Sequence, residues 1–452
     1  MLKIIEKNPV TTHISDGSVI KELLSYKAEY WKNIVTKEGM VLKRKEKKIY
    51  YKSLVAKGLF LAGFQQRVFQ FLKQKQIPFE FDKPDYKIKG KVGDLKGITF
   101  RGDQKEALNV LIGAKRGVWQ APTASGKTIL ICGLVKAFLT SALVIVHTTD
   151  LFHQTLEELQ RFFDPDLVGR FGLGDEEIKE ITVGMIQTLN KREFPKDQWG
   201  MVICDECHHV NSFSGSYFNV LKRIMAPMRF GFTATLPQTE EGKLALEGLI
   251  GPVVGKTSYE ELQEVEVLAK PILKLYKVPE SDRYKDMKGG YKVVYEAGIV
   301  RNRARNKLIV DEARELIEQG RTVLVMVEMV SHGYELLDMF EALMPGVFAF
   351  VHGSTESEIR QEEKQAFGSK TRRGVIATRV WSEGTNIRTI GAVINAIGGE
   401  SEIASIQRFG RGMRKAEGKN DVILVDFFDT NHKWFLKHSG NRICTYMEWG
   451  LL

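Results

Sequence analysis

Residues 121–128 read A-P-T-A-S-G-K-T, and their types suit the binding of a nucleoside triphosphate. Small residues let the backbone approach a phosphate closely, and successive backbone N–H groups of such a loop can cradle an anion. Lys127 can reach the β- and γ-phosphates, and the Thr128 hydroxyl can hold Mg²⁺. The pattern therefore predicts ATP and Mg²⁺ as cofactors, bound by Pro122, Thr123, Ala124, Ser125, Gly126, Lys127 and Thr128.

Two adjacent carboxylates, Asp205 and Glu206, follow the apolar run at 201–204. Carboxylates at the C-terminal end of a parallel strand suit Mg²⁺–ATP chemistry. We predict that Asp205 holds the metal and that Glu206 orients and deprotonates the attacking water. The same stretch, with Cys204, Cys207 and His208, matches the C-x-x-C-H pattern of haem attachment or half a zinc site. No second cysteine pair follows and no export signal precedes it, so the carboxylate interpretation is preferred.

Two later stretches also carry side chains that suit phosphate chemistry. Residues 233–235 read T-A-T, whose hydroxyls could link the carboxylates to a nucleic acid, although an ordinary turn would look the same. Residues 407–414 read Q-R-F-G-R-G-M-R. On a helix Arg411 and Arg414 would face one way, and planar guanidinium groups suit the charge that develops on a transferred phosphate. A basic surface helix is the simpler alternative.

These groups need a scaffold that brings distant segments together. From about residue 93, short apolar runs alternate with helical stretches, which is typical of parallel sheets with helices on both faces. The alternation weakens between about 252 and 300 and then resumes. Two α/β sheets in tandem are therefore predicted, the second without a phosphate loop. The expected strands are 142–147, 181–184, 200–204, 229–233, 322–327, 347–351, 374–377, 391–394 and 421–425.

The net charge of +10 is concentrated at one end of the chain. Residues 1–100 hold 21 Lys or Arg and 10 Asp or Glu, whereas the rest hold 45 and 46. A clustered positive field usually meets a polyanion, although it can also be a merely solvated face. Neither a membrane-length apolar run nor the apolar core of a signal peptide is found. We expect a cytoplasmic monomer without membrane association, in the host cytoplasm if phage-encoded.

Residues 1–92 are expected to form a small α+β domain. The run 55–72 has helical spacing and predicts a buried face made of Leu59, Phe60, Phe64, Val68, Phe69 and Leu72. Tyr30, Trp31, Tyr50 and Tyr51 alternate with lysines and are better candidates for nucleic-acid contact.

Taken in order, these motifs resemble motifs I, II, III and VI of the superfamily 2 helicases, over residues 95–430. Further residues resemble the glutamine that reads adenine (Gln104), motif Ia (Thr148, Thr149), motif Ic (Gln187, Thr188) and motif V (Thr378 to Asn386). Asn386 departs from the Asp of many relatives, and Ala124 from a common Gly. The resemblance implies two RecA-like domains, at 93–268 and 269–452, that follow the N-terminal domain.

The resemblance also implies roles for named residues. Catalysis would fall to Lys127, Asp205, Glu206, Gln407, Arg411 and Arg414, nucleotide binding also to Gln104 and Gly384, and nucleic-acid contact to Thr148, Thr149, Gln187, Thr188 and Thr378. ATP would sit between the two RecA-like domains, and alternating grip on phosphates would move the protein along a strand.

A narrower likeness, carried by V-S-H-G at 330–333 and the basic N-terminal domain, is to the phage recombination helicases of the UvsW type. It implies a motor on branched, duplex or single-stranded DNA that migrates branches, regresses forks and unwinds D-loops or R-loops. An RNA helicase, a remodeller without unwinding, a degenerate binding scaffold and a restriction motor remain alternatives. The loop around Gly398, Gly399 and Glu400 is a candidate for the strand-separating element.

Overall fold

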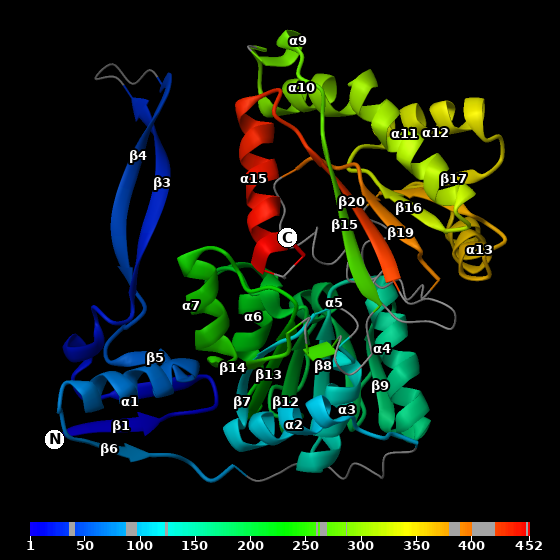
Figure 1. Ribbon diagram of the computed structural model, residues 1–452. Coiled ribbons are helices and arrows are strands. Elements are labelled where there is room, and N and C mark those ends of the chain that lie inside the picture. The colour runs from blue at the N-terminus through cyan, green and yellow to red at the C-terminus, as the bar shows by residue number, and fades with distance from the viewer. Residues whose placement is uncertain are drawn as a thin grey trace. The chain divides into compact units, whose positions relative to one another are not determined.

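The computed structural model describes residues 1–35, 41–86, 97–122, 125–258, 261–262, 269–285, 287–378, 389–399, 421–448 and 451–452 (Figure 1). At 29–35, 41–50, 357 and 448 the backbone alone is described. Two compact units are distinguished, one made of Met1–Ala121 and Lys127–Thr257 and the other of Pro122–Gly126 and Ser258–Leu452. No helix within the described ranges has the length and apolar character needed to span a bilayer.

The first unit begins with a mixed four-stranded sheet in the order β5-β2-β1-β6, in which β1 and β6 run parallel. Its elements are β1 (Leu2–Glu6), β2 (Thr11–Ile14), β5 (Leu59–Leu61), β6 (Phe79–Asp82) and α1 (Gln65–Gln74), with 3-10 turns at Gly17–Ile20 and Ala62–Phe64.

The helix predicted over 55–72 was wrong in its first half. Lys57 and Gly58 both have positive φ, so the chain turns there and Leu59 pairs with His13 as part of β5. Leu59 is 42% exposed, against the prediction. The rest of the predicted face is correct, because Phe60, Phe64, Val68 and Leu72 are buried in one core and Phe69 packs against it.

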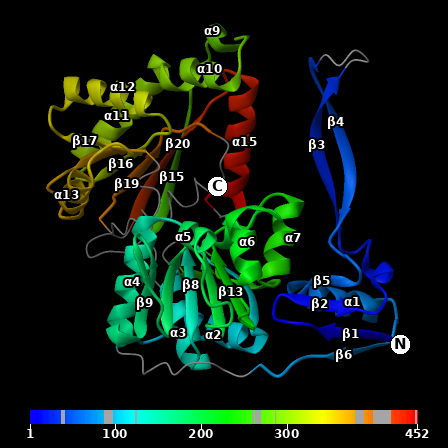
Figure 2. The ribbon, with the colours of Figure 1, turned by 180° about the vertical axis from the view of Figure 1, so that it is seen from behind.

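A long hairpin, β3 (Ser25–Val35) and β4 (Val41–Ser53), interrupts this module, and Figure 2 shows it from behind. Residues 25–53 contain nine Lys or Arg and three Glu, a net charge of +6. The antiparallel register places Tyr30 opposite Lys48, Trp31 opposite Lys47 and Lys27 opposite Tyr51. The basic and aromatic residues noted in the sequence therefore share one two-stranded ribbon.

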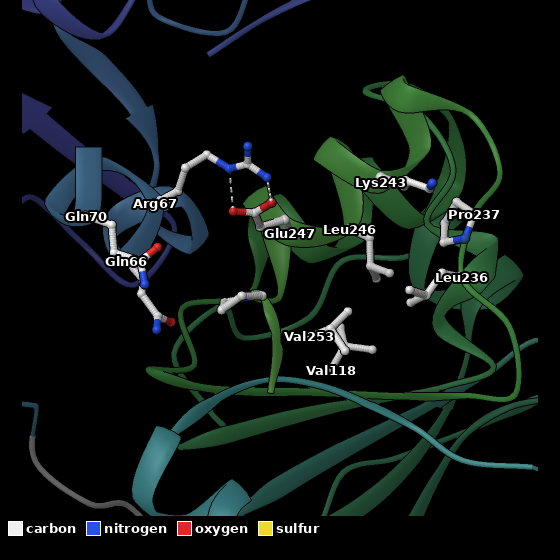
Figure 3. Close-up of a pocket in the computed structure, with 12 residues that line it drawn as sticks. Gln66, Arg67, Gln70, Val118, Leu236, Pro237, Lys243, Leu246, Glu247 and Val253 are labelled. Carbon is white, nitrogen blue, oxygen red and sulfur yellow. Dashed lines mark hydrogen bonds and ion pairs between the residues drawn. The ribbon is translucent and has the colours of Figure 1, made fainter. Parts of the chain in front are cut away.

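The module packs against helix α7 (Glu240–Leu249) of the same unit. A Cβ on Gly63 would lie 1.9 Å from the carbonyl oxygen of Glu247, so glycine is required for this close approach. Leu244 joins the module's core, and Arg67 pairs with Glu247. Figure 3 shows that pair beside a groove of about 580 Å³ between α1 and the sheet edge.

The first unit's larger sheet has the order β10-β9-β11-β8-β12-β13-β7-β14 and is parallel except at β10. Helices α2, α3 and α4 pack on one face, and α5, α6 and α7 on the other. The strands are β7 (Arg116–Gln120), β8 (Ala142–Val146), β9 (Val168–Gly172), β10 (Asp175–Glu177), β11 (Ile181–Met185), β12 (Met201–Asp205), β13 (Met228–Thr233) and β14 (Val253–Lys256). The helices are α2 (Gly102–Ala114), α3 (Lys127–Phe138), α4 (Thr149–Phe162), α5 (Ile186–Lys191) and α6 (Gly215–Arg223), with 3-10 turns at Pro165–Leu167 and Cys207–His209.

The second unit holds an all-parallel sheet in the order β15-β20-β19-β16-β18-β17. Helices α11 and α12 contribute to the core on one face, and α13 and α15 to the core on the other. The strands are β15 (Lys270–Lys277), β16 (Val323–Met326), β17 (Phe348–Val351), β18 (Gly374–Ala377), β19 (Ala392–Asn395) and β20 (Asp421–Phe428). The helices are α9 (Asp282–Lys285), α10 (Tyr291–Tyr295), α11 (Arg303–Glu318), α12 (Val330–Leu343), α13 (Ser357–Gly368) and α15 (Lys433–Glu448), with a π-helical turn at Glu296–Val300.

Two parallel α/β sheets in tandem are thus confirmed, and every predicted strand is present within one to two residues at either end except the last, which continues to Phe428. Strand β15 was not predicted. Its sequence, K-P-I-L-K-L-Y-K, has Lys at both ends and in the middle. It lies at the sheet edge and is half-exposed, so it lacks the continuous apolar run of the central strands.

Candidate ATP and nucleic-acid site

Three neighbouring strands of the first unit end at the same edge of the sheet and carry the predicted chemistry. Strand β13 lies between β12 and β7, with Asp205 opposite Phe232 and Thr233 opposite Gln120. Because carboxyl ends of parallel strands meet at one edge, the phosphate loop after β7 lies beside the carboxylates after β12. Distant sequence motifs are brought together by strand order.

The phosphate loop is tied at its start to the end of β13. The Ala121 N–H donates to the Thr233 carbonyl oxygen at 2.8 Å, and the Gln120 amide donates to the Ala234 carbonyl oxygen at 3.1 Å. Gly126 has φ 87°, a conformation that favours glycine, and Lys127 begins helix α3. Thr123 and Ala124 lie outside the described residues.

Lys127 and Glu206 form an ion pair with Nζ and Oε1 2.7 Å apart. Burial opposes the charge of both groups, but their mutual attraction prevails, so the pKa of Glu206 is lowered and that of Lys127 is raised. Burial, together with the charge of Glu206, raises the pKa of Asp205 despite the opposing charge of Lys127. The site therefore holds an ionised Glu206 next to Asp205, whose charged form would be stabilised most by a bound cation.

The backbone at Glu206 is strained. It adopts φ 48° and ψ 50°, the left-handed region that residues other than glycine seldom occupy. Its N–H donates to the Asp205 Oδ1 at 3.0 Å, which helps to hold the turn. Strain of this kind clusters at functional sites, and here it directs the Glu206 side chain toward Lys127.

His208, which follows Asp205, Glu206 and Cys207 in the sequence, joins the carboxylates to the end of β13, a link that was not predicted. Its Nδ1 lies 3.0 Å from the Thr233 hydroxyl and 3.5 Å from Glu206 Oε2. The Thr233 hydroxyl also donates to the Thr235 carbonyl oxygen at 2.7 Å. The T-A-T stretch is thus connected to the carboxylates through an imidazole.

The two cysteines of the C-x-x-C-H pattern are ordinary core residues. Both thiols are buried and free. Burial raises the pKa of Cys204 to about 12 and that of Cys207 well above its ordinary value, so neither is a ready metal ligand. Among the described residues, no three or more His, Cys, Asp or Glu side chains gather as a metal site. The oxygen donors of Asp205 and Thr128 still suit Mg²⁺, which usually takes one or two carboxylates together with substrate phosphates.

The predicted nucleic-acid residues of this unit also lie near the carboxyl edge. The Thr148 hydroxyl caps α4 by accepting from the Leu151 N–H at 3.3 Å, and Thr149 is the first helical residue. The Gln187 amide donates to the His147 carbonyl oxygen at 2.8 Å, with Thr188 next along α5. The segments that resemble motifs Ia and Ic are therefore joined directly.

The remaining predicted residues are less closely defined. Gln104 is buried and its Oε1 accepts from the Arg101 N–H at 3.2 Å, which caps α2. Thr378 follows β18 in the second unit and is buried. The other predicted residues lie outside the described ranges: Gly384, Gln407, Arg411 and Arg414.

Two regions of the chain match known protein families. Residues 97–238 match the family described as type III restriction enzyme, res subunit, and residues 305–416 match the helicase conserved C-terminal domain. The chain is 26% identical to the DNA 3'-5' translocase XPB2 of Sulfurisphaera tokodaii, over 73% of this chain and 81% of that protein. It is also 26% identical to the ATP-dependent DNA helicase uvsW of Enterobacteria phage T4, over 76% of this chain and 74% of that protein.

Among solved structures, S. cerevisiae Dbp5 bound to RNA and ADP BeF3 has the same fold, with a TM-score of 0.55. The match has 15% sequence identity and covers 77% of this chain and 87% of that one.

Proposed function

We propose that this chain, which belongs to superfamily 2 of the helicases and is a nucleic-acid-dependent ATPase, uses ATP to move along branched DNA. The observation that carries the proposal is the Lys127–Glu206 pair at 2.7 Å beside Asp205, at the edge where β7, β13 and β12 end. The DNA translocase and DNA helicase named among its relatives support DNA rather than RNA as the track.

The chemistry follows from what each group can do. Lys127 would leave Glu206 for the β- and γ-phosphates, and Asp205 with Thr128 would hold Mg²⁺, which neutralises charge on those phosphates when bound. Freed from Lys127, Glu206 would become a stronger base and could orient and deprotonate water. In this proposal residues 93–268 and 269–452 are the two motor halves, and Arg411 and Arg414 supply cations to the transferred phosphate.

ATP turnover with and without nucleic acid tests this directly. We expect stimulation by forked DNA and four-way junctions to exceed that by blunt duplex or single-stranded RNA, and Lys127→Ala to abolish turnover. Lys105→Ala, at an exposed position on α2, is the control and should behave like the parent. Equal turnover in parent and Lys127→Ala would refute the site, and greater stimulation by RNA would make the chain an RNA motor.

The β3–β4 hairpin is proposed as the element that holds duplex near the branch. A two-stranded ribbon fits the major groove, and an isolated hairpin is marginally stable in water, so a polyanionic partner suits its charge of +6. Changing Lys43, Arg44, Lys45, Lys47 and Lys48 to Gln should raise the Kd for forked DNA about tenfold or more and flatten its salt dependence.

The matched control for the hairpin changes Lys73 and Lys75, exposed near the end of α1 in the same module, to Gln. If the five-residue and the two-residue variants weaken binding equally per charge removed, the effect belongs to net charge and the hairpin has no special role.

A further inference from the structure

A second histidine, His209, lies beside the ATP site and takes no part in the chemistry above. It ends the 3-10 turn Cys207–His209, and its Nε2 lies 3.1 Å from the Nε2 of His147. His147 follows β8, and β8 and β12 are neighbours with Cys204 opposite Ile145. Two segments that are 62 residues apart therefore meet through their imidazoles at the carboxyl edge of the sheet.

The contact is held from several sides. The ring centroids of His147 and His209 are 4.0 Å apart, and those of His208 and His209 are 4.3 Å apart. The Tyr217 ring lies nearly parallel to His209, at 6.0 Å and 11°. For the two Nε2 atoms to bond, one must carry a proton and the other a lone pair. The pair is thus a directed hydrogen bond within a packed group of rings.

Each histidine of the pair adjoins a segment with a different proposed function. On one side His209 adjoins His208, which bonds Thr233 and lies 3.5 Å from Glu206. On the other side, the His147 carbonyl oxygen accepts from Gln187, and the next residue, Thr148, caps α4. A shift of Glu206 and His208 would therefore reach the turn at 147–149 through the two imidazoles.

We propose that the His209–His147 pair is a positioning link that couples the nucleotide state at Glu206 to the nucleic-acid grip of the turn at 147–149. The inference rests on the proposed function. When ATP draws Lys127 away from Glu206, the carboxylate and His208 rearrange toward the phosphate, and His209 carries the change to His147. By linkage, nucleic acid bound at the turn changes the affinity for nucleotide by the same factor.

The test measures the Kd for forked DNA with a non-hydrolysable ATP analogue and with ADP. Couplings of this kind are typically about 5- to 150-fold. In His209→Ala and in His147→Ala we expect the ratio of the two Kd values to approach one. Because both changes break the same contact, the double variant should show no further fall in this ratio. His209→Gln keeps an amide that can donate or accept at about the same reach and should restore most of the ratio.

Tyr217→Phe is the matched control, since it keeps the ring beside His209 and removes only a hydroxyl, and it should retain the parent ratio. If the parent itself shows equal Kd values in both nucleotide states, the proposed function fails. If the parent shows a ratio that His209→Ala retains in full, the link is overturned. Should the alanine variants not fold, the same ratio of Kd values is measured in His209→Asn, whose side chain is too short for the contact, and that ratio decides between the two outcomes.

Discussion

The two units build buried ion pairs on similar parallel sheets, but the pairs differ in kind. In the first unit the side chains of Lys127 and Glu206 are 11% and 13% exposed, at the ends of strands. In the second unit the side chains of Arg442 and Asp426 are 2% and 1% exposed, inside the core. A phosphate can replace Glu206 as the partner of Lys127, whereas nothing from solvent can reach Arg442.

The second unit's pair belongs to a network that fixes a loop. Arg442 donates to Asp426 at 2.8 Å and to the carbonyl oxygens of Gly399 and Phe427 at 3.0 and 2.8 Å. The Tyr446 hydroxyl donates to the same Asp426 carboxylate at 2.6 Å. Although burial opposes its charge, Asp426 raises the pKa of Arg442 above its ordinary value.

The anchored loop bears on one sequence-based suggestion, that residues 398–400 form the strand-separating element. Besides Gly399, the carbonyl oxygen of Ala396 accepts from Arg305 at 2.9 Å, and that of Ile397 accepts from the Tyr295 hydroxyl. A backbone held at three carbonyls is poorly suited to act as a strand-separating element, so residues 398 and 399 are better explained as a fixed start for the segment that follows. Glu400 lies outside the described residues.

The largest effect is expected in the first unit, where the pair is proposed to act in ATP hydrolysis. Glu206→Gln should lower turnover about 10²- to 10⁴-fold while ATP still binds, because an amide cannot take the proton from water. Single-turnover hydrolysis and nucleotide binding, measured separately, check this. Glu240→Gln, an exposed change at the start of α7, is the control. Turnover within threefold of the parent would remove Glu206 from the role of base.

The corresponding change in the second unit should cost stability. Arg442→Ala leaves Asp426 buried without its cation and should lower the free energy of unfolding by about 3–5 kcal/mol. Tyr446→Phe removes one hydrogen bond and should cost about 1–2 kcal/mol. Urea titration checks both, with Lys433→Ala on the exposed start of α15 as control. A loss of turnover without loss of stability would show that this network is functional.

Lowering the pH should destabilise the second unit through a buried histidine, which gives a further difference between the two units. His332 of α12 is buried and its Nε2 lies 2.9 Å from Asn306 Oδ1, and burial, followed by the charge of Arg305, lowers its pKa to about 3. In the unfolded chain the His332 side chain takes up a proton near pH 6.5, whereas in the folded chain it stays neutral until about pH 3. The free energy of unfolding is therefore highest above pH 6.5 and falls as the pH is lowered toward 3. Between pH 7 and 5 the loss should be about 2 kcal/mol.

Urea midpoints of the parent and His332→Gln at pH 5, 6 and 7 check this, and the variant should show the shallower slope. The Lys127–Glu206 pair should add little to it, because the pKa of Glu206 is lowered and its contribution is lost as pH falls from the ordinary carboxylate pKa toward the lowered one. Equal slopes in parent and variant would contradict the prediction. The V-S-H-G stretch would then need another explanation than a neutral histidine in the core.

The central strands and the location of the phosphate loop could be predicted because they rest on short-range patterns. Apolar strands buried on both faces form continuous runs, and the phosphate loop is a local sequence. The turn before β5 was missed because the apolar positions of 59–72 have helical spacing. Nothing in that spacing shows that Lys57 and Gly58 adopt positive φ and reverse the chain. The His147–His209 contact could not be read from sequence, since strand pairing alone brings its halves together.

A third kind of ion pair, Arg67 with Glu247, should have the smallest effect. It is bidentate, at 2.8 and 2.5 Å, but the Arg67 side chain is 41% exposed, so solvent screens much of the attraction. A double-mutant cycle with Arg67→Ala and Glu247→Ala should give a coupling of about 0.5–1 kcal/mol in unfolding.

Packing should hold the N-terminal module on α7 more strongly than this charge pair does. Gly63→Ala places a methyl group against the Glu247 carbonyl oxygen, so it should destabilise the protein by more than the whole Arg67–Glu247 coupling. If the coupling instead exceeded about 2 kcal/mol, the pair would rank with buried ones. Solvent exposure would then not explain why the three ion pairs differ in their effect. The partner available to each charge would have to explain that difference alone.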